Sequence, residues 1–238
     1  MVPRLACAVW LAARAAPAQP PAFEVASIKP STPEAPGNNI QRDPAGGMAL
    51  ANVNLRTLVL MAYPIQPFQL SGGPPWLRWR RFDITAKASA GGHKDQTWLM
   101  LQTLLADRFQ LAIHRETREL PIFEIVAAKG GIRIQPAQRA PGAADDSIQT
   151  FAGRIKALMV PMPDLALVLS GMSGHLVVDR TGLKGKYDFP LEFAPEGADS
   201  DLPSLYTALQ TQLGLRLETA KGPVEMIVID HAAMPSAN

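Results

Sequence analysis

The sequence predicts an α+β fold, a tandem repeat of two βαββαββ units in which each unit is a small sheet with two helices on one face. The first observation is a helical stripe that occurs twice. Its apolar residues are Leu55, Leu58, Val59 and Ala62, and they return 107 positions later as Met162, Leu165, Ala166 and Leu169. The second observation is that short strand-like runs surround both stripes. The third is the abundance of turn residues between these runs, with 22 prolines and 18 glycines in 238 residues.

The first unit follows from these patterns in chain order. We expect strands at 48–53, 68–71 and 81–86, because each is a short apolar run bounded by turn residues. The helix at 55–63 follows Asn54, a residue type that caps helix N-termini. A second helix should run from a cap at Asp95 to about Arg108, and strands 109–115 and 122–129 should then form a closing hairpin.

The second unit repeats this order. Its helical stripe Tyr206, Leu209, Leu213 and Leu217 matches Trp98, Leu101, Leu105 and Phe109 at a spacing of 108, with Leu-Gln-Thr at both 101–103 and 209–211. Phe189 matches Phe82 at a spacing of 107, and Pro203 is expected in the first turn of the second helix. The predicted organisation is a signal peptide (1–18), an N-terminal strand and proline-rich loop (19–47), the first unit (48–134), a linker (135–153) and the second unit (154–238).

The N-terminus predicts export. It has a basic start, a nine-residue apolar run at 5–13 and the small-residue motif Ala16-Pro17-Ala18, as in secretory signal peptides. Removing 1–18 removes Arg4, Arg14 and the single cysteine, so the net charge of +2 becomes zero. A neutral chain gives no reason to expect a nucleic-acid partner. No other run approaches the length of a membrane span, so we expect a periplasmic or extracellular protein without a transmembrane segment in the mature chain.

Charge differs between the two units. Residues 54–135 carry a net charge of +5 and residues 155–238 a net charge of −4. Opposite fields could dock the units together or mark surfaces for different partners.

Several motifs along the chain together resemble a known family. They lie at 23–31, 81–84, 104–109, 114–121, 178–182, 187–189, 213–218 and 228–231. On these motifs the chain is similar to the uncharacterised exported proteins, mostly of soil Acidobacteria, that are classed as domain of unknown function DUF3738 (Solibacter-type). The resemblance implies no reaction, cofactor or catalytic residue. Residues 205–217 also resemble, more weakly, the short N-terminal domain of secretins and TonB-dependent receptors, which meets other envelope proteins.

The strongest candidate binding site is a basic, aromatic stretch at 76–81. Trp76, Arg78, Trp79 and Arg80 could stack on a glycan or on a partner's aromatic rings, or bind acidic groups. The alternative is one tryptophan in the core and solvated arginines. His114, Arg115 and Glu116 form a second candidate, since a histidine beside a carboxylate can act as a general base. The alternative there is a charged hairpin that discourages aggregation.

These observations favour a non-enzymatic binding or interaction protein of the cell envelope, with a protein or glycan partner. We expect the loop at 72–81 and the hairpin around His114 to form one contact surface. No spacing of the four histidines or the single cysteine indicates a metal site, and no motif indicates a catalytic residue or a cofactor. An envelope hydrolase using His114 with a carboxylate, and a sensor module for a membrane peptidase, are the alternatives.

Overall fold

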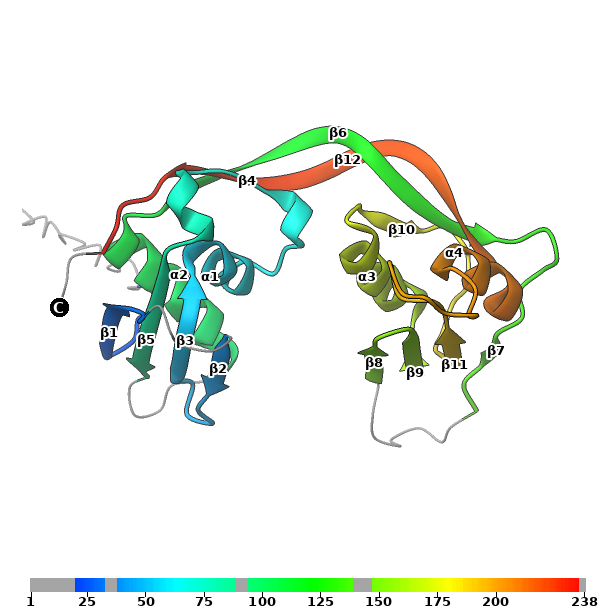
Figure 1. Cartoon of the computed structure of the whole chain (residues 1–238), viewed down its shortest axis with the longest axis horizontal. Helices are drawn as coiled ribbons and strands as arrows, with labels where there is room; N and C mark the ends of the chain where they lie inside the picture. The colour runs from blue at the N-terminus through cyan, green and yellow to red at the C-terminus, as the bar shows by residue number, and fades with distance from the viewer. Residues whose placement is uncertain (1–19, 33–37, 89–93, 139–146, 236–238) are drawn as a thin grey trace, which may run out of the picture.

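The computed structural model describes residues 20–32, 38–88, 94–138 and 147–235, and the predicted signal peptide lies outside these residues. They form two lobes joined by a long ribbon of two strands (Figure 1). The fold is α+β, as the sequence predicts, with three four-stranded sheets.

The first lobe contains an antiparallel sheet in the order β1-β5-β3-β2. Two helices separate this sheet from the ribbon (Figure 1). The expected N-terminal strand is β1, and the loop that follows it contributes β2. The elements are β1 (Val25–Pro30), β2 (Asn39–Arg42), β3 (Met48–Asn54), α1 (Leu55–Ala62), β5 (Arg81–Lys87) and α2 (Thr97–Phe109), with short 3-10 helices η1 (Pro67–Gln69), η2 (Pro75–Arg78) and η3 (Lys94–Gln96).

The second lobe has the same order of strands and helices along the chain. Its sheet has the strand order β7-β11-β9-β8. Strands β7 and β8 come from the segment expected to be a linker, so its described residues contribute to this sheet. The elements are β7 (Gln135–Pro136), β8 (Ser147–Phe151), β9 (Arg154–Val160), α3 (Met162–Ser173), β11 (Tyr187–Glu192), α4 (Leu205–Ala208) and the single-turn π-helix η4 (Leu209–Leu213).

The ribbon consists of β6 (Ala112–Ala127) and β12 (Leu215–His231), which pair antiparallel along nearly their whole length. Strand β6 leaves the first lobe and ends in the second, and β12 runs the opposite way (Figure 1). Short strands extend the ribbon at its two ends in parallel: β4 (Leu70–Gly72) beside β12, and β10 (Val177–Asp179) beside β6. Each lobe is therefore completed by a strand that starts in the other.

The predicted closing hairpins are wrong. The segment between 115 and 122 does not turn, because Glu116–Leu120 stay extended and pair with Gly222–Met226. Pro121 and Pro223 are compatible with this, since each lies where its strand has a neighbour on one side only. The two-unit prediction captured the element order but not the exchange of strands between the halves.

A β-bulge occurs at the same place in both lobes. Asn52 and Met159 have positive φ angles of 58° and 57°, and each backbone N–H donates to an aspartate on the neighbouring strand. The acceptors are the carboxylates of Asp83 at 2.8 Å and Asp188 at 2.6 Å. Matching the lobes at these bulges equates Phe82 with Tyr187 instead of Phe189, so the predicted strand match is wrong by two residues.

The predicted match between the second helices of the two lobes is also wrong, by four residues or about one helical turn. Each ends at a residue in the left-handed conformation, Gln110 after α2 and Gly214 after η4. Phe109 therefore corresponds to Leu213, and the repeated Leu-Gln-Thr is not structurally equivalent. The caps differ from the prediction as well. Ser204 caps α4, which places Pro203 before the helix, and η3 containing Asp95 precedes α2.

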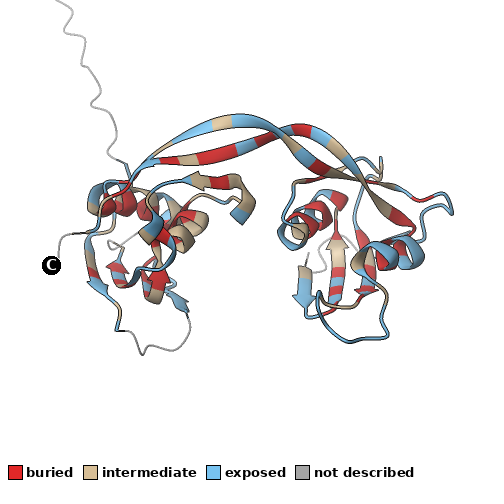
Figure 2. Ribbon diagram, turned by 45° about the horizontal axis from the view of Figure 1, so that its top comes forward, coloured by how far each residue is buried: buried red, intermediate tan, exposed pale blue. Residues whose placement is uncertain are grey.

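The predicted helical stripes at 55–62 and 162–169 are buried. The stripe predicted for the second helix of the second unit is wrong in part, because Tyr206 is 50% exposed and Leu217 lies in β12. Each lobe has its own core between its sheet, its helices and its end of the ribbon, and Figure 2 shows buried stretches in all three layers. The first core includes Ile227 and Ile229 of β12, and the second includes Ile125 of β6. The stripe residues Leu55, Leu58, Val59, Ala62, Met162, Leu165, Ala166 and Leu169 are all 4% exposed or less.

Candidate functional site

The stretch 76–81 begins on η2 and continues into β5. Gly72 and Gly73, with φ angles of 76° and 78°, turn the chain out of β4, and Pro75 starts the 3-10 helix. This geometry separates the two tryptophans. Trp76 packs against the first core, edge-on to Phe82 with ring centroids 6.5 Å apart. Trp79 comes one turn later and remains 59% exposed.

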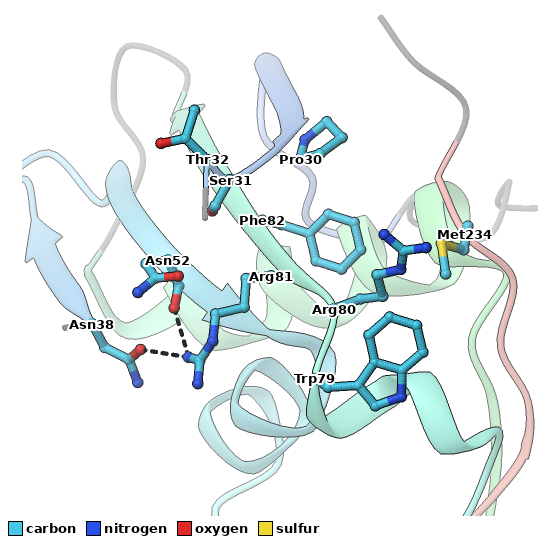
Figure 3. Close-up of a pocket in the computed structure, with 10 residues that line it drawn as sticks. All are labelled: Pro30, Ser31, Thr32, Asn38, Asn52, Trp79, Arg80, Arg81, Phe82 and Met234. Carbon is cyan, nitrogen blue, oxygen red and sulfur yellow. Dashed lines mark hydrogen bonds between the residues drawn. The ribbon is translucent and has the colours of Figure 1, made fainter. Parts of the chain in front are cut away.

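A cavity of about 500 Å³ opens beside Trp79 (Figure 3). Arg80 lies over the Trp79 ring, with the guanidinium carbon 4.7 Å from the ring centroid. This cation–π contact fixes a positive charge at the cavity wall. The walls come from the ends of β1, β3 and β5 and from the segment after β12; the lining residues are Pro30, Ser31, Thr32, Asn38, Asn52, Trp79, Arg80, Arg81, Phe82 and Met234.

Arg81 is held on the other side of the cavity. Its Nη1 donates to Asn38 Oδ1 at 2.9 Å and to the carbonyl oxygen of Asn52 at 3.0 Å, as Figure 3 shows. The nearby carboxylate of Asp83 accepts from Ser31 Oγ at 2.5 Å and from the bulge at Asn52. Within the described part of the chain, neither Arg80 nor Arg81 is paired with a carboxylate. The described lining of the cavity thus contributes two positive charges and no carboxylate.

Arg78 does not line this cavity. It lies with Arg56 at a second cavity of about 280 Å³ beside β4. The pKa of Arg56 is lowered, first by burial and then by the positive charge of Arg78. The guanidinium of Arg56 donates to the carbonyl oxygens of Pro67 and Leu70, so it holds η1 and β4 together.

His114 lies on β6, in a row of charged side chains along the ribbon. Its Nδ1 is 2.8 Å from Asp230 Oδ1 on β12, and its Nε2 is 3.8 Å from Glu116 Oε2. Glu116 also pairs with Arg118, and Arg115 pairs with Glu225 on β12. The contacts of His114 with Asp230 and of Arg115 with Glu225 join β6 to β12, whereas the two contacts of Glu116 lie within β6. His114 thus lies on the ribbon, while Trp79 and Arg80 line the cavity.

The contact with Asp230 gives a testable pH dependence. The hydrogen bond that His114 donates to the Asp230 carboxylate is the largest cause that raises the pKa of His114 above its ordinary value of 6.5. Because the folded pKa is raised, the added stability is fully present below pH 6.5 and disappears as the pH rises through the folded pKa. We expect Asp230→Asn to lower the pKa of His114 toward 6.5 in an NMR titration. His175, whose Nδ1 lies 2.9 Å from the carbonyl oxygen of Ser173, is the internal control. An unchanged His114 pKa in the variant would show that the pair does not form in solution.

Sequence reasoning identified part of the cavity and missed the rest. Trp79, Arg80 and the adjoining Arg81 were found because basic and aromatic residues alternate there. The remaining walls include residues 30–32, 38, 52 and 234, which are distant in the sequence. The pairing of β1, β3 and β5 brings 30–32 and 52 to the cavity, and 38 and 234 lie just outside β2 and β12. These residues carry no local signal that distinguishes them from other loop residues.

No helix among the described residues is long and apolar enough to cross a membrane. No three histidine, cysteine or acidic side chains in these segments gather where they could hold a metal ion.

The fold and the cavity define a two-lobed α+β protein with a cationic, aromatic-walled recess in one lobe. The chain belongs to the family described as protein of unknown function (DUF3738), which matches residues 56–232. This match confirms the family resemblance of the sequence. No curated protein and no solved structure matches the chain.

Proposed function

We propose that this protein is an exported binding protein of the cell envelope and that its ligand enters the cavity beside Trp79. One observation carries the proposal: a largely exposed tryptophan stands beside two arginines that have no carboxylate partner among the described residues. Aromatic rings and arginine are the side chains that contribute most to binding where they are free to contact a partner. A volume of about 500 Å³ lies within the range of small-molecule sites.

Export rests on the N-terminal sequence. A basic start, a short apolar run and a small-residue motif support a cleaved signal peptide at 1–18. The single cysteine would leave with it, which suits an oxidising compartment. The weak likeness of 205–217 to the short domain of secretins and TonB-dependent receptors also favours an envelope location. By these arguments the mature protein is periplasmic or extracellular.

The test is crosslinking capture of the tagged mature protein from its native envelope, read by mass spectrometry. We expect Trp79→Ala with Arg80→Ala to abolish capture of a specific ligand while the melting temperature stays nearly unchanged, because both side chains are exposed. Trp76→Ala is unsuitable for this purpose, since Trp76 packs on the core.

Arg42→Ala is the matched control. Arg42 lies over the ring of Trp98 at 5.2 Å, so the change also removes one charge and one cation–π contact from the same lobe. Equal capture by the native protein and the Trp79/Arg80 double variant would contradict the proposal.

A hydrolase is the second candidate function, and the His114–Asp230 contact favours it. A carboxylate that orients a histidine is part of many acid–base sites. The contacts of His114 among the described residues are to carboxylates, with no hydroxyl nucleophile. The same Asp230→Asn variant distinguishes the two functions, because a hydrolase would lose turnover of peptide or glycan substrates and a binding protein would keep its ligand.

A further inference from the structure

The polar groups of the Trp79 cavity are mostly hydrogen-bond donors. Arg80 and Arg81 carry positive charges, and Asn38 and Thr32 add an amide and a hydroxyl. Arg81 uses only Nη1 for its two contacts, so within the described residues its Nε and Nη2 donate to no other protein group. The carboxylate of Asp83, which lies close to the described lining, already accepts two hydrogen bonds. The complementary ligand is rich in acceptors and negatively charged.

The apolar groups of the cavity favour a ring. Trp79 and Met234 both line the cavity, with the Arg80 side chain between them, and the pyrrolidine of Pro30 lies near Phe82 (Figure 3). Flat apolar surface of this kind packs against the faces of ring compounds. The hydroxyl- and amide-bearing residues on the opposite wall suit a ring that also carries hydroxyl groups. These features distinguish a sugar from a purely apolar acid.

The positions of the two guanidinium groups restrict where a ligand's negative charge can bind. In Figure 3 the two guanidinium groups lie on different sides of the cavity, with Arg81 between Asn38 and Asn52 and Arg80 above Trp79. Arg81 is fixed by its two hydrogen bonds and Arg80 by its stacking on the indole ring. Both are thus held in place before a ligand arrives, which reduces the entropy lost on binding.

We infer that the cavity binds a sugar bearing an oxyanion, either a carboxylate or a phosphate, with the ring beside Trp79 and the anion held by arginine. This inference rests on the proposed function and specifies its ligand class. An acidic peptide is the competing ligand. Its carboxylates would pair with the arginines. It has no hydroxyl-bearing ring to contact both Trp79 and the polar side chains on the opposite wall.

The experiment is an NMR titration of the mature protein, followed through the indole N–H of Trp79 that Trp79→Phe assigns. The probes are glucuronate, glucose 6-phosphate, glucose and tetraglutamate. We expect both charged sugars to shift this signal with an affinity at least about tenfold higher than that of glucose, a ratio that one charge-assisted hydrogen bond can supply. The ratio of the affinities for glucuronate and glucose 6-phosphate shows whether the cavity prefers a carboxylate or a phosphate.

Arg80→Gln should weaken glucuronate binding at least about tenfold, while the matched Arg42→Gln leaves it unchanged. Added salt should also weaken it, because the cavity is open to solvent. Equal affinity for glucose and glucuronate, a preference for tetraglutamate, or no shift with any probe would each overturn the inference. None of these results would overturn the proposed function, which the envelope capture experiment tests separately.

Discussion

Fragments 20–138 and 147–238, produced separately, are expected to remain unfolded, and to fold when they are combined. The physical reason is the exchange of strands in the ribbon. Fragment 20–138 lacks the end of β12, whose Ile227 and Ile229 are 0% and 3% exposed in the first core. Fragment 147–238 lacks the end of β6, whose Ile125 is 0% exposed in the second core.

The size of the effect follows from these contacts. Each buried isoleucine contributes about 1.5–3 kcal/mol, and a whole domain is stable by only about 5–15 kcal/mol. The fragments also lose the pairing of β4 with β12 and of β10 with β6. The hydrogen bond from Gln69 Nε2 to the carbonyl oxygen of Glu225, at 2.9 Å, disappears too. Together these losses approach the full stability of a lobe.

Circular dichroism and amide hydrogen exchange of α1 and α3 provide the measurement. Separate fragments should lack protected helix amides, and an equimolar mixture should regain them. Fragment 20–138 with Ile125→Asp should fail to complement, whereas the same fragment with Thr117→Ala, a change at an exposed site on the same strand, should succeed. Native protection in either fragment alone would show that the exchanged strands are dispensable.

Gly214→Ala is expected to destabilise the protein far more than Gly174→Ala. Both glycines end a helical segment in the left-handed conformation, with φ angles of 67° and 69°. The backbone strain of an alanine there is therefore the same, about 1–2 kcal/mol. Their surroundings differ. A β-carbon at Gly214 would overlap the carbonyl oxygen of Gly131, while at Gly174 it would meet nothing within 4 Å.

The overlap at Gly214 cannot be relieved by a side-chain rotation, because the opposing atom is backbone. The turn that contains it is fixed by hydrogen bonds from Ala128 N to Gly214 O at 2.8 Å and from Arg133 N to Leu213 O at 2.9 Å. Moving it would disturb the start of β12. Thermal unfolding should show a fall of roughly 2–4 °C per kcal/mol lost, and thus a several-fold larger fall for Gly214→Ala. Equal melting temperatures for the two variants would refute the packing of this turn against η4.

The candidate site depended on both local and long-range structure. Alternation of tryptophan and arginine drew attention to the stretch 76–81 but left open whether one of its tryptophans is in the core. The structure packs Trp76 on the core and leaves Trp79 exposed, a difference that depends on the 3-10 turn between them. His114 was expected on a hairpin, whereas β6 is a continuous strand.

The sequence by itself determined the α+β class, the order of the elements and the buried faces of α1 and α3, because these depend on periodicity and turn residues close together in the chain. Periodicity could not fix the match between the halves. An apolar stripe resembles itself after a shift of four residues, and a strand after a shift of two, which are the errors found at Phe109 and Phe82. Only the tertiary structure decided that β6 and β12 exchange lobes. Two strands of a hairpin and one continuous strand of the same length have the same alternation of apolar and polar residues. They differ only in which segment accepts and donates their backbone hydrogen bonds, and for β6 and β12 that segment is distant in the sequence.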